Sequence, residues 1–168
     1  MAGSFSVVPL DPAADRSGFE CGVEPLDRYF KTQVTQDIKR RVTACFTAMD
    51  ASGRVAGYYT LASASIFLSD LPVNLAKKLP RYPNVPAVRM GRLAVDQRYK
   101  GKGLGAALLA DALRRAVTAE IAAYAFVVDA KDERAAKFYA HYGFHASVEN
   151  PLFLYLPLVT VKDLVKLS

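Results

Sequence analysis

The sequence is poor in the residues that build metal centres and disulfides. It contains only two cysteines, Cys21 and Cys45, and two histidines, His141 and His145, with no metal-ligand spacing among them. This scarcity argues against a structural zinc site and is typical of a protein from a reducing compartment. We therefore expect a protein without a metal.

Long uncharged hydrophobic runs are also missing. No apolar stretch approaches the roughly 20 residues that a transmembrane helix needs. The first ten residues lack the basic segment and long apolar core of a secretory signal. No repeat, linker or low-complexity segment divides the 168 residues. We expect a single domain over residues 1–168 that is cytoplasmic and has no membrane partner.

Acidic residues are in the minority. The chain has 22 lysines and arginines against 16 aspartates and glutamates, a formal charge of +6. This balance disfavours a pocket for cationic substrates and suits anionic or nucleic-acid partners, although an excess of lysine can also serve solubility alone. With 52% apolar and 23% charged residues, the composition is that of a globular protein.

Hydrophobic periodicity and turn residues predict an α/β fold with a mixed sheet. A helix opens at Glu24 and Pro25, with Leu26, Phe30, Val34 and Ile38 as its buried seam. A hairpin turn is expected at 50–53, and prolines at 72, 80, 83 and 86 predict an irregular region. Further strands are predicted at 5–9, 42–49, 55–63, 85–95, 121–128, 144–148 and 152–156, and further helices at 104–117, from 129–132 to Gly143, and at 161–167.

The most informative stretch is a glycine-rich turn between the strand at 85–95 and the helix that follows. Glycines stand at 101, 103 and 105, and Lys100 and Lys102 alternate with them. Glycine lets a backbone approach a phosphate closely, and the free N–H groups of a helix start can bind the anion. The spacing fits neither the dinucleotide fingerprint nor the P-loop, which needs Gly-Lys-Ser/Thr. The turn predicts a site for a different phosphorylated ligand.

Two motifs resemble the GNAT N-acetyltransferase superfamily. The pattern Arg98-x-x-Gly101-x-Gly103 is similar to its coenzyme A pyrophosphate loop, and Asp129-Ala130-x-Asp132-x-x-Ala135-x-x-Phe138-Tyr139-x-x-x-Gly143-Phe144 to its last helix and strand. The resemblance implies the GNAT fold, a mixed central β-sheet flanked by helices with splayed central strands, and acetyl-CoA as co-substrate. The implied cofactor-binding residues are Leu93, Ala94, Val95, Arg98, Lys100, Gly101, Lys102, Gly103, Leu104, Gly105, Asp132 and Phe138.

The resemblance also implies a catalytic residue, because Tyr139 occupies the position of the general acid. A phenol of pKa about 10 is protonated at neutral pH and can donate to a departing thiolate. Alternatively Phe138, Tyr139 and Tyr142 only pack in the core. Tyr142 is the competing candidate for the acid, although its position before Gly143-Phe144 matches a packing aromatic better. The central strand offers no glutamate or histidine as base, and we expect Asp96 to be structural. An α-amino group of pKa near 8 loses its proton more readily than a lysine amine of pKa about 10.4, so that water, or no dedicated base, would suffice.

A narrower resemblance covers most of the chain. Phe19-x-Cys21-Gly22-x-x-x-Leu26-Asp27-x-Tyr29-Phe30, Gly57-Tyr58-Tyr59-Thr60-Leu61 and Gly91-Arg92-Leu93-Ala94-Val95-Asp96 are similar to the acetyltransferase toxins of type II toxin–antitoxin modules. This implies acetylation of the α-amino group of aminoacyl-tRNA, which blocks translation, and neutralisation by a ribbon-helix-helix antitoxin. We also expect a homodimer. The alternatives are a GNAT enzyme that acts on a small-molecule amine or a protein N-terminus, and a non-catalytic CoA-binding module.

A tRNA substrate would give the basic residues a role, since Lys and Arg contacts to phosphate supply salt-dependent affinity. The expected substrate-binding residues are Arg92, Arg89, Lys39, Arg40 and Arg81. In a regular strand Arg89 and Arg92 would face opposite sides, so both serve one site only if a bulge intervenes.

Overall fold

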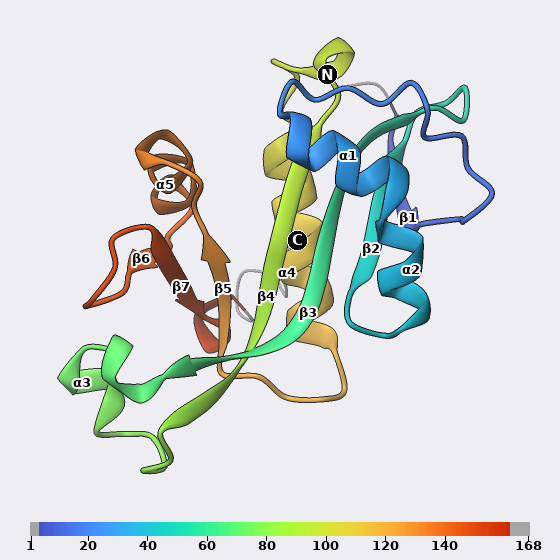
Figure 1. The fold of residues 1–168 in the computed structure, drawn as a ribbon. Coiled ribbons are helices and arrows are strands. Elements are labelled where there is room, and N and C mark those ends of the chain that lie inside the picture. The colour runs from blue at the N-terminus through green and yellow to red at the C-terminus, as the bar shows by residue number, and fades with distance from the viewer. Residues whose placement is uncertain (1–3, 162–168) are drawn as a thin grey trace. The chain divides into compact units, whose positions relative to one another are not determined.

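The structure, a computed structural model, describes residues 4–161 of the 168-residue chain. Its elements are β1 (Ser6–Pro9), α1 (Glu24–Thr32), α2 (Val34–Lys39), β2 (Ala44–Met49), β3 (Val55–Phe67), η1 (Leu68–Asp70), α3 (Val73–Ala76), β4 (Asn84–Val95), η2 (Gln97–Tyr99), α4 (Leu104–Thr118), β5 (Ala125–Asp129), α5 (Glu133–His141), β6 (His145–Ala146) and β7 (Phe153–Pro157) (Figure 1). Beyond Val161, the helix predicted at 161–167 lies outside the described residues.

The strands hydrogen-bond in the order β1-β2-β3-β4-β5-β7-β6. The pair β4–β5 is parallel, whereas β1–β2, β2–β3, β5–β7 and β6–β7 are antiparallel. The predicted α/β class with a mixed sheet is therefore confirmed. Two compact units divide the chain, unit 1 with residues 1–62 and 91–112 and unit 2 with residues 63–90 and 113–168. The single domain over residues 1–168 stays a prediction.

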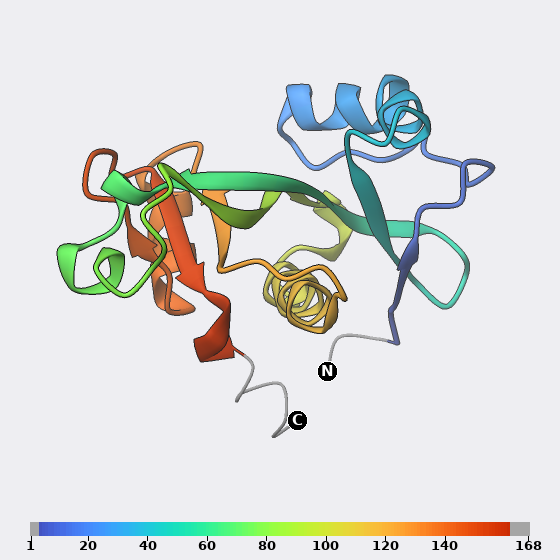
Figure 2. The same cartoon turned by 90° about the horizontal axis from the view of Figure 1, so that it is seen from below.

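In unit 1, α1 and α2 lie on one face of the strands and the start of α4 on the other (Figure 2). The core beneath α1 is aromatic: Phe30 stacks on Tyr58 with ring centroids 4.2 Å apart, and Phe19 packs edge-on against both. The predicted hairpin turn is present, since the Asp50 carboxylate accepts hydrogen bonds from the backbone N–H groups of Ser52 and Arg54.

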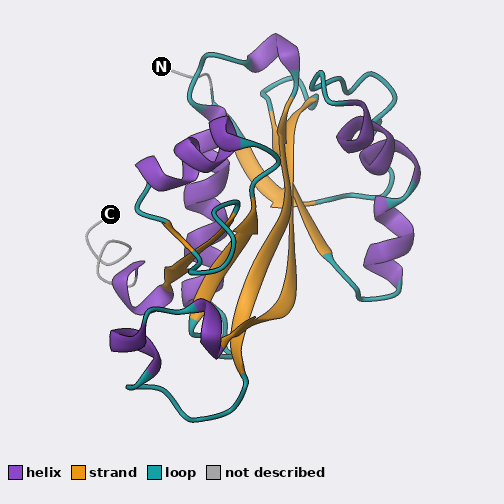
Figure 3. Ribbon diagram, turned by 60° about the vertical axis from the view of Figure 1, so that its left-hand side comes forward, coloured by secondary structure: helices purple, strands orange, loops and turns teal. Residues whose placement is uncertain are grey.

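The single helix predicted from Glu24 through Ile38 is wrong, because the chain forms two helical segments (Figure 3). Gln33 leaves the helical conformation at φ −124° and separates α1 from α2. The predicted seam nevertheless faces the core, with Phe30 and Val34 fully inaccessible and Leu26 and Ile38 partly buried. Apolar spacing thus identified the buried face but not the break in the backbone.

In unit 2, β5 is buried between β4 and β7, and its strand begins later than predicted. Ala125 is its first residue, whereas Ile121 is 87% exposed and lies outside the strand. The pairing of β4 with β5 runs from Ala87–Ala125 to Met90–Val128, and β4 continues beyond Met90 to Val95. The pairing of β4 with β5 therefore ends before β4 does, as expected for central strands that splay apart.

The proline-rich region of unit 2 is largely irregular, as predicted, and contains only the short helices η1 and α3. It packs through Leu71 and Leu75 onto Ile66 and Val85. The helix α5 ends at His141, and Gly143 follows its C-cap Tyr142 with a φ of +96°, a left-handed conformation that favours glycine. The predicted final strand pair is confirmed as β6 and β7.

Candidate active site

The glycine turn of unit 1 has an open backbone. Gly101 and Gly103 both have φ of +78°, and an added Cβ at either would meet no atom within 4 Å. Glycine is thus required for conformation, not for space. The helix α4 follows at once, with the N–H of Ala107 bonded to the carbonyl of Gly103. Because the N–H groups at a helix start lack intrahelical partners, this turn fits a pyrophosphate.

Asp96 fixes the start of this turn. Its side chain is almost fully buried and accepts hydrogen bonds from the backbone N–H of Glu20 and from the backbone, Nε and Nη2 of Arg98, at 2.9–3.0 Å. Burial acts to raise the pKa of Asp96, but these hydrogen bonds outweigh it and hold the pKa below its usual value. The expected structural role of Asp96 is confirmed, and the Arg98 side chain is bound to it.

The loop that precedes α1 also contacts the turn, through Glu20 and Cys21. Lys100 donates from Nζ to the carbonyl of Cys21 at 2.7 Å, and the backbone N–H of Gln97 donates to Glu20. Both lysines are exposed, but the Lys100 ammonium is hydrogen-bonded to protein, whereas the Nζ of Lys102 lies 5.8 Å from the Tyr99 ring centroid. The two lysines, which looked equivalent in the sequence, have different surroundings.

The strand residues that precede the turn are Leu93, Ala94 and Val95, of which Ala94 is buried in the aromatic core. Nearby, Thr60 carries a buried hydroxyl that has no hydrogen-bond partner among residues 4–161. A Cβ placed on Gly91 would lie 3.4 Å from this hydroxyl. Thr60 was not among the predicted site residues, although a threonine inside the apolar run at 57–61 was the available signal.

Arg92 lies on α1. Its guanidinium carbon is 3.3 Å from the centroid of the Tyr29 ring, and the Tyr29 hydroxyl donates to Asp37 at 2.7 Å. Burial, followed by the hydrogen bond to Asp37, raises the pKa of Tyr29. The other predicted basic residues of unit 1, Lys39 and Arg40, are exposed at the end of α2.

Tyr139 lies in unit 2, on α5, and is only 8% exposed. Its ring packs edge-on against Phe138 and tilted against Phe144, with centroids 5.2 and 5.5 Å away. Burial raises the pKa of Tyr139 to about 12. Within residues 4–161 its hydroxyl makes no hydrogen bond to another residue. A buried phenol that is protonated at neutral pH and has a free hydroxyl can serve as a proton donor.

The burial of the two tyrosines near the end of α5 is the reverse of the prediction. Tyr142, expected to be the packing aromatic, is 43% exposed and touches Phe138 and His141, so that Tyr139 takes the core position. The helix ends at this point, which turns Tyr142 outward. Asp132 caps the helix, since its carboxylate accepts from the N–H of Ala135 at 2.8 Å.

Arg89 lines a cavity of unit 2 beside Asp129. Its Nη2 lies 3.6 Å from a carboxylate oxygen of Asp129, and its buried Nε has no hydrogen-bond partner in residues 4–161. Both residues line a cavity of about 350 Å³. Arg89 and Arg92 thus contact different partners, Asp129 and Tyr29 respectively.

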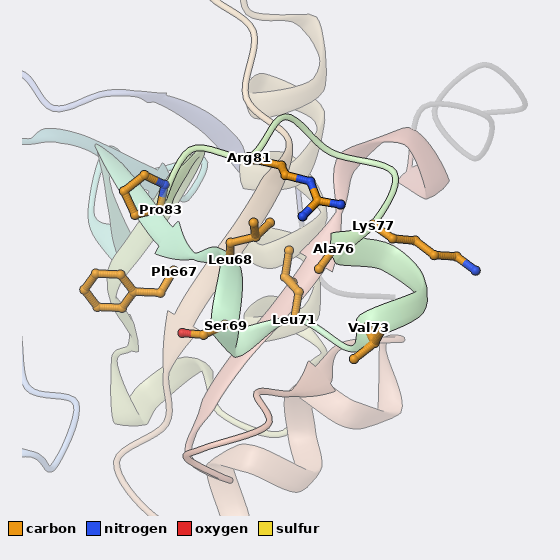
Figure 4. A pocket seen from close by; sticks show the side chains of 9 residues that line it. All are labelled: Phe67, Leu68, Ser69, Leu71, Val73, Ala76, Lys77, Arg81 and Pro83. Atoms are coloured by element: carbon orange, nitrogen blue, oxygen red, sulfur yellow. The ribbon is translucent and has the colours of Figure 1, made fainter.

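Arg81 borders a larger cavity of about 680 Å³. Figure 4 shows its guanidinium reaching over the space between Leu68 and Ala76, while Lys77 extends outward. Phe67 also lines this cavity and is 60% exposed. An exposed aromatic ring and exposed cations that line the same cavity form an arrangement that unpaired nucleotides can bind.

Residues 4–161 include no group of three or more His, Cys, Asp or Glu residues that could hold a metal ion. Cys21 and Cys45 are free and buried, and burial raises the pKa of both thiols, to about 11 and about 12. In the same part of the chain, no helix has the length and apolar character needed to cross a membrane.

The comparison with known proteins is informative over nearly the whole chain. A tRNA-acetylating toxin of Mycobacterium tuberculosis (strain ATCC 25618 / H37Rv) is 34% identical over 167 residues, covering 98% of this chain and 99% of the relative. A probable toxin TacT of Sinorhizobium fredii (strain NBRC 101917 / NGR234) is 31% identical, covering 95% of this chain and 94% of the relative.

Solved structures agree with these relatives. The structure of AtaT complexed with acetyl-methionyl-tRNAfMet has a TM-score of 0.90 at 29% identity, covering 96% of this chain and 99% of that one. The sequence model of the acetyltransferase (GNAT) domain matches residues 14–159. The chain therefore belongs to the GNAT family of acetyl-CoA-dependent N-acetyltransferases.

Proposed function

We propose that this acetyltransferase is a toxin that acetylates the α-amino group of aminoacyl-tRNA and so blocks translation. The observation that carries the proposal is the 34% identity to a tRNA-acetylating toxin along 98% of the chain. The likeness to AtaT complexed with acetyl-methionyl-tRNAfMet supports the same acceptor. Exposed cations and the exposed ring of Phe67 supply surfaces suited to an unpaired tRNA end.

The transfer needs one proton donor and no strong base. The amine nitrogen forms a bond to the acetyl carbon, the carbon–sulfur bond breaks, and the departing thiolate takes a proton. Tyr139 supplies this proton, because its raised pKa keeps the phenol protonated. After attack the amine nitrogen loses its proton to water, and no strong base is needed because an α-amino group of pKa near 8 reaches its neutral form far more readily than a lysine amine of pKa about 10.4.

The donor is held by unit 1 in this proposal. Backbone N–H groups of the turn from Gly101 to Gly105 bind the pyrophosphate, and main-chain groups near Leu93–Val95 bind the pantetheine arm. The open left-handed glycines fit this role, since a side chain there would impose strain. Because Arg98 and Lys100 are engaged with Asp96 and Cys21, they act by shaping the turn.

Partners follow from the same proposal. Solved relatives include AtaT bound to the C-terminus of the antitoxin AtaR, at 27% identity and a TM-score of 0.80. We infer that an antitoxin of the ribbon-helix-helix type neutralises this chain and that two copies form a homodimer. The enzyme would act in the cytoplasm, where charged tRNA is found.

The test is incubation with radiolabelled acetyl-CoA and total charged tRNA, followed by analysis of the amino acids released from the tRNA. We expect N-acetylated aminoacyl groups from the wild-type enzyme, and a loss of about 100-fold or more in the Tyr139→Phe variant. Acetylation of a small amine or a protein N-terminus, with every aminoacyl-tRNA left unmodified, would favour the alternative acceptors and overturn the proposal.

A further inference from the structure

The cavity of about 350 Å³ in unit 2 combines charged groups with an apolar wall. It is lined by Ser65, Ile66, Phe67, Asp70, Arg89, Asp129, Ser147, Asn150 and Phe153. The Ser147 hydroxyl donates a hydrogen bond to the backbone carbonyl of Asn150 and accepts one from its backbone N–H. The side-chain oxygen of Asn150 accepts a hydrogen bond from the backbone N–H of Leu152. The charged groups that line the cavity are the guanidinium of Arg89 and the carboxylates of Asp70 and Asp129.

The pair between Arg89 and Asp129 is open to a third group. Its 3.6 Å separation is longer than a hydrogen bond, and the Asp129 side chain is 60% exposed. The buried Nε of Arg89 has no partner in residues 4–161. An orphaned donor in a buried position is costly, and a ligand oxygen would satisfy it.

The charge of the cavity selects the kind of ligand. One arginine and two aspartates give a net charge of −1 in a chain whose formal charge is +6. A phosphate would meet two carboxylates here, whereas an amino group would meet an acceptor. The side chains of Ile66, Phe67 and Phe153 add an apolar surface beside these charges.

We propose that this cavity binds the aminoacyl group of the acceptor. The carboxylate of Asp129 accepts a hydrogen bond from the α-amino group, and Nε of Arg89 donates to an oxygen of the ester or ribose. The amino-acid side chain packs on Ile66, Phe67 and Phe153. This inference rests on the proposed function and adds to it a substrate class: apolar aminoacyl groups are preferred, and acidic ones are repelled by Asp70 and Asp129.

The experiment uses one tRNA charged in turn with methionine, leucine, glycine, aspartate or glutamate by ribozyme-catalysed acylation, so that only the aminoacyl group differs. For the wild-type enzyme we expect kcat/KM for methionine and leucine to exceed that for aspartate and glutamate by about tenfold or more. Asp129→Asn and Arg89→Lys should raise KM for methionyl-tRNA by about tenfold, since each removes a charged hydrogen bond. KM for acetyl-CoA should stay unchanged.

Matched controls separate binding from folding. Arg134→Lys and Glu120→Gln change exposed side chains outside the cavity and should leave every constant as in the wild type. Phe67→Ala alters an exposed ring that lines both cavities and should lower kcat/KM more for methionyl-tRNA than for glycyl-tRNA. Asp70→Asn should narrow the difference between methionyl and aspartyl substrates, which a purely structural residue would not do.

The outcomes distinguish the two proposals. If no charged tRNA is acetylated by the wild-type enzyme, both the acceptor assignment and this cavity are wrong. If charged tRNA is acetylated but the panel shows no side-chain preference, and the Phe67, Arg89 and Asp129 variants keep the wild-type KM, only the cavity assignment is overturned.

Discussion

The guanidinium carbon of Arg92 on β4 lies 3.3 Å above the centre of the Tyr29 ring on α1. The Tyr29 hydroxyl continues the contact to Asp37 on α2, and Gln33 donates to the same carboxylate. One strand residue is thus connected to both helical segments of unit 1. The Gly91–Asp96 motif and the Phe19–Phe30 motif, separate in the sequence, meet at this contact.

Removal of this contact should destabilise the protein. We expect Arg92→Met to lower the free energy of unfolding by about 1 kcal/mol, because a partly desolvated cation–π contact is lost while the aliphatic stem is kept. The free energy of unfolding of Arg92→Lys should lie between those of the wild type and Arg92→Met. Urea denaturation measures the effect, with Arg134→Met on the exposed face of α5 as the matched control. Equal stability of Arg92→Met and wild type would contradict a stabilising role for the Arg92–Tyr29 pair.

The left-handed glycines of the turn allow a test of the donor site. Gly101→Ala and Gly103→Ala each place a Cβ on a backbone of φ +78°, which costs about 1–2 kcal/mol. The turn should relieve this strain by changing shape, so acetyl-CoA should bind roughly 5- to 30-fold more weakly by calorimetry. Gly18→Ala is the control, since Gly18 has neither a positive φ nor an atom within 4 Å of an added Cβ. Unchanged affinity in both turn variants would argue against a backbone cradle.

The pKa of Tyr139 predicts the pH dependence of the transfer. A proton donor is active below its pKa, and burial raises the pKa of Tyr139 to about 12. Activity should therefore not fall between pH 7 and about 9.5, and it should rise until the α-amino group is fully neutral. Single-turnover rates at saturating acetyl-CoA provide the measurement. A decline with a midpoint near pH 8 or 9 would mean that another group donates the proton.

The same shift affects stability only in strong alkali. A phenol whose folded pKa exceeds its unfolded value of about 10 contributes stability that is complete below pH 10. That contribution is lost as the pH rises from 10 through 12. Between pH 7 and about 9.5, Tyr139→Phe and the wild type should therefore differ in their rates of transfer, while the ionisation of Tyr139 should not change the stability of the wild type.

Local patterns accounted for most of the fold. Alternating and periodic apolar residues located the strands and the buried seam, because burial is decided by spacing along one element. The hairpin at 50–53 and the helix end at Gly143 were predicted from residues that tolerate special backbone angles. The break at Gln33 was missed because no proline or glycine marks it, and only the φ of −124° reveals it.

The site was predictable in outline but not in its contacts. The glycine spacing and the Tyr139 motif were legible in the sequence, whereas the partners of Arg98 and Lys100 are set by residues far away along the chain. Asp96 binds the N–H of Glu20, and Lys100 reaches Cys21, 79 positions away. Basic side chains that look equivalent in a sequence differ in whether such contacts hold them, even where all of them are exposed.

Lys77 and Arg81 are exposed at the cavity of Figure 4 and should bind phosphates of the tRNA. Each lost phosphate contact reduces the slope of log affinity against log salt by about 0.7–0.9. In Lys77→Gln/Arg81→Gln we therefore expect a higher KM for charged tRNA at low salt and a slope shallower by about 1.5, measured from 50 to 200 mM KCl. Hydrolysis of acetyl-CoA should be unaffected. The matched pair Lys137→Gln/Arg134→Gln removes the same charge from exposed positions of α5 and should retain the wild-type slope. If both double variants shift the slope equally, net charge and not this surface governs the binding of tRNA.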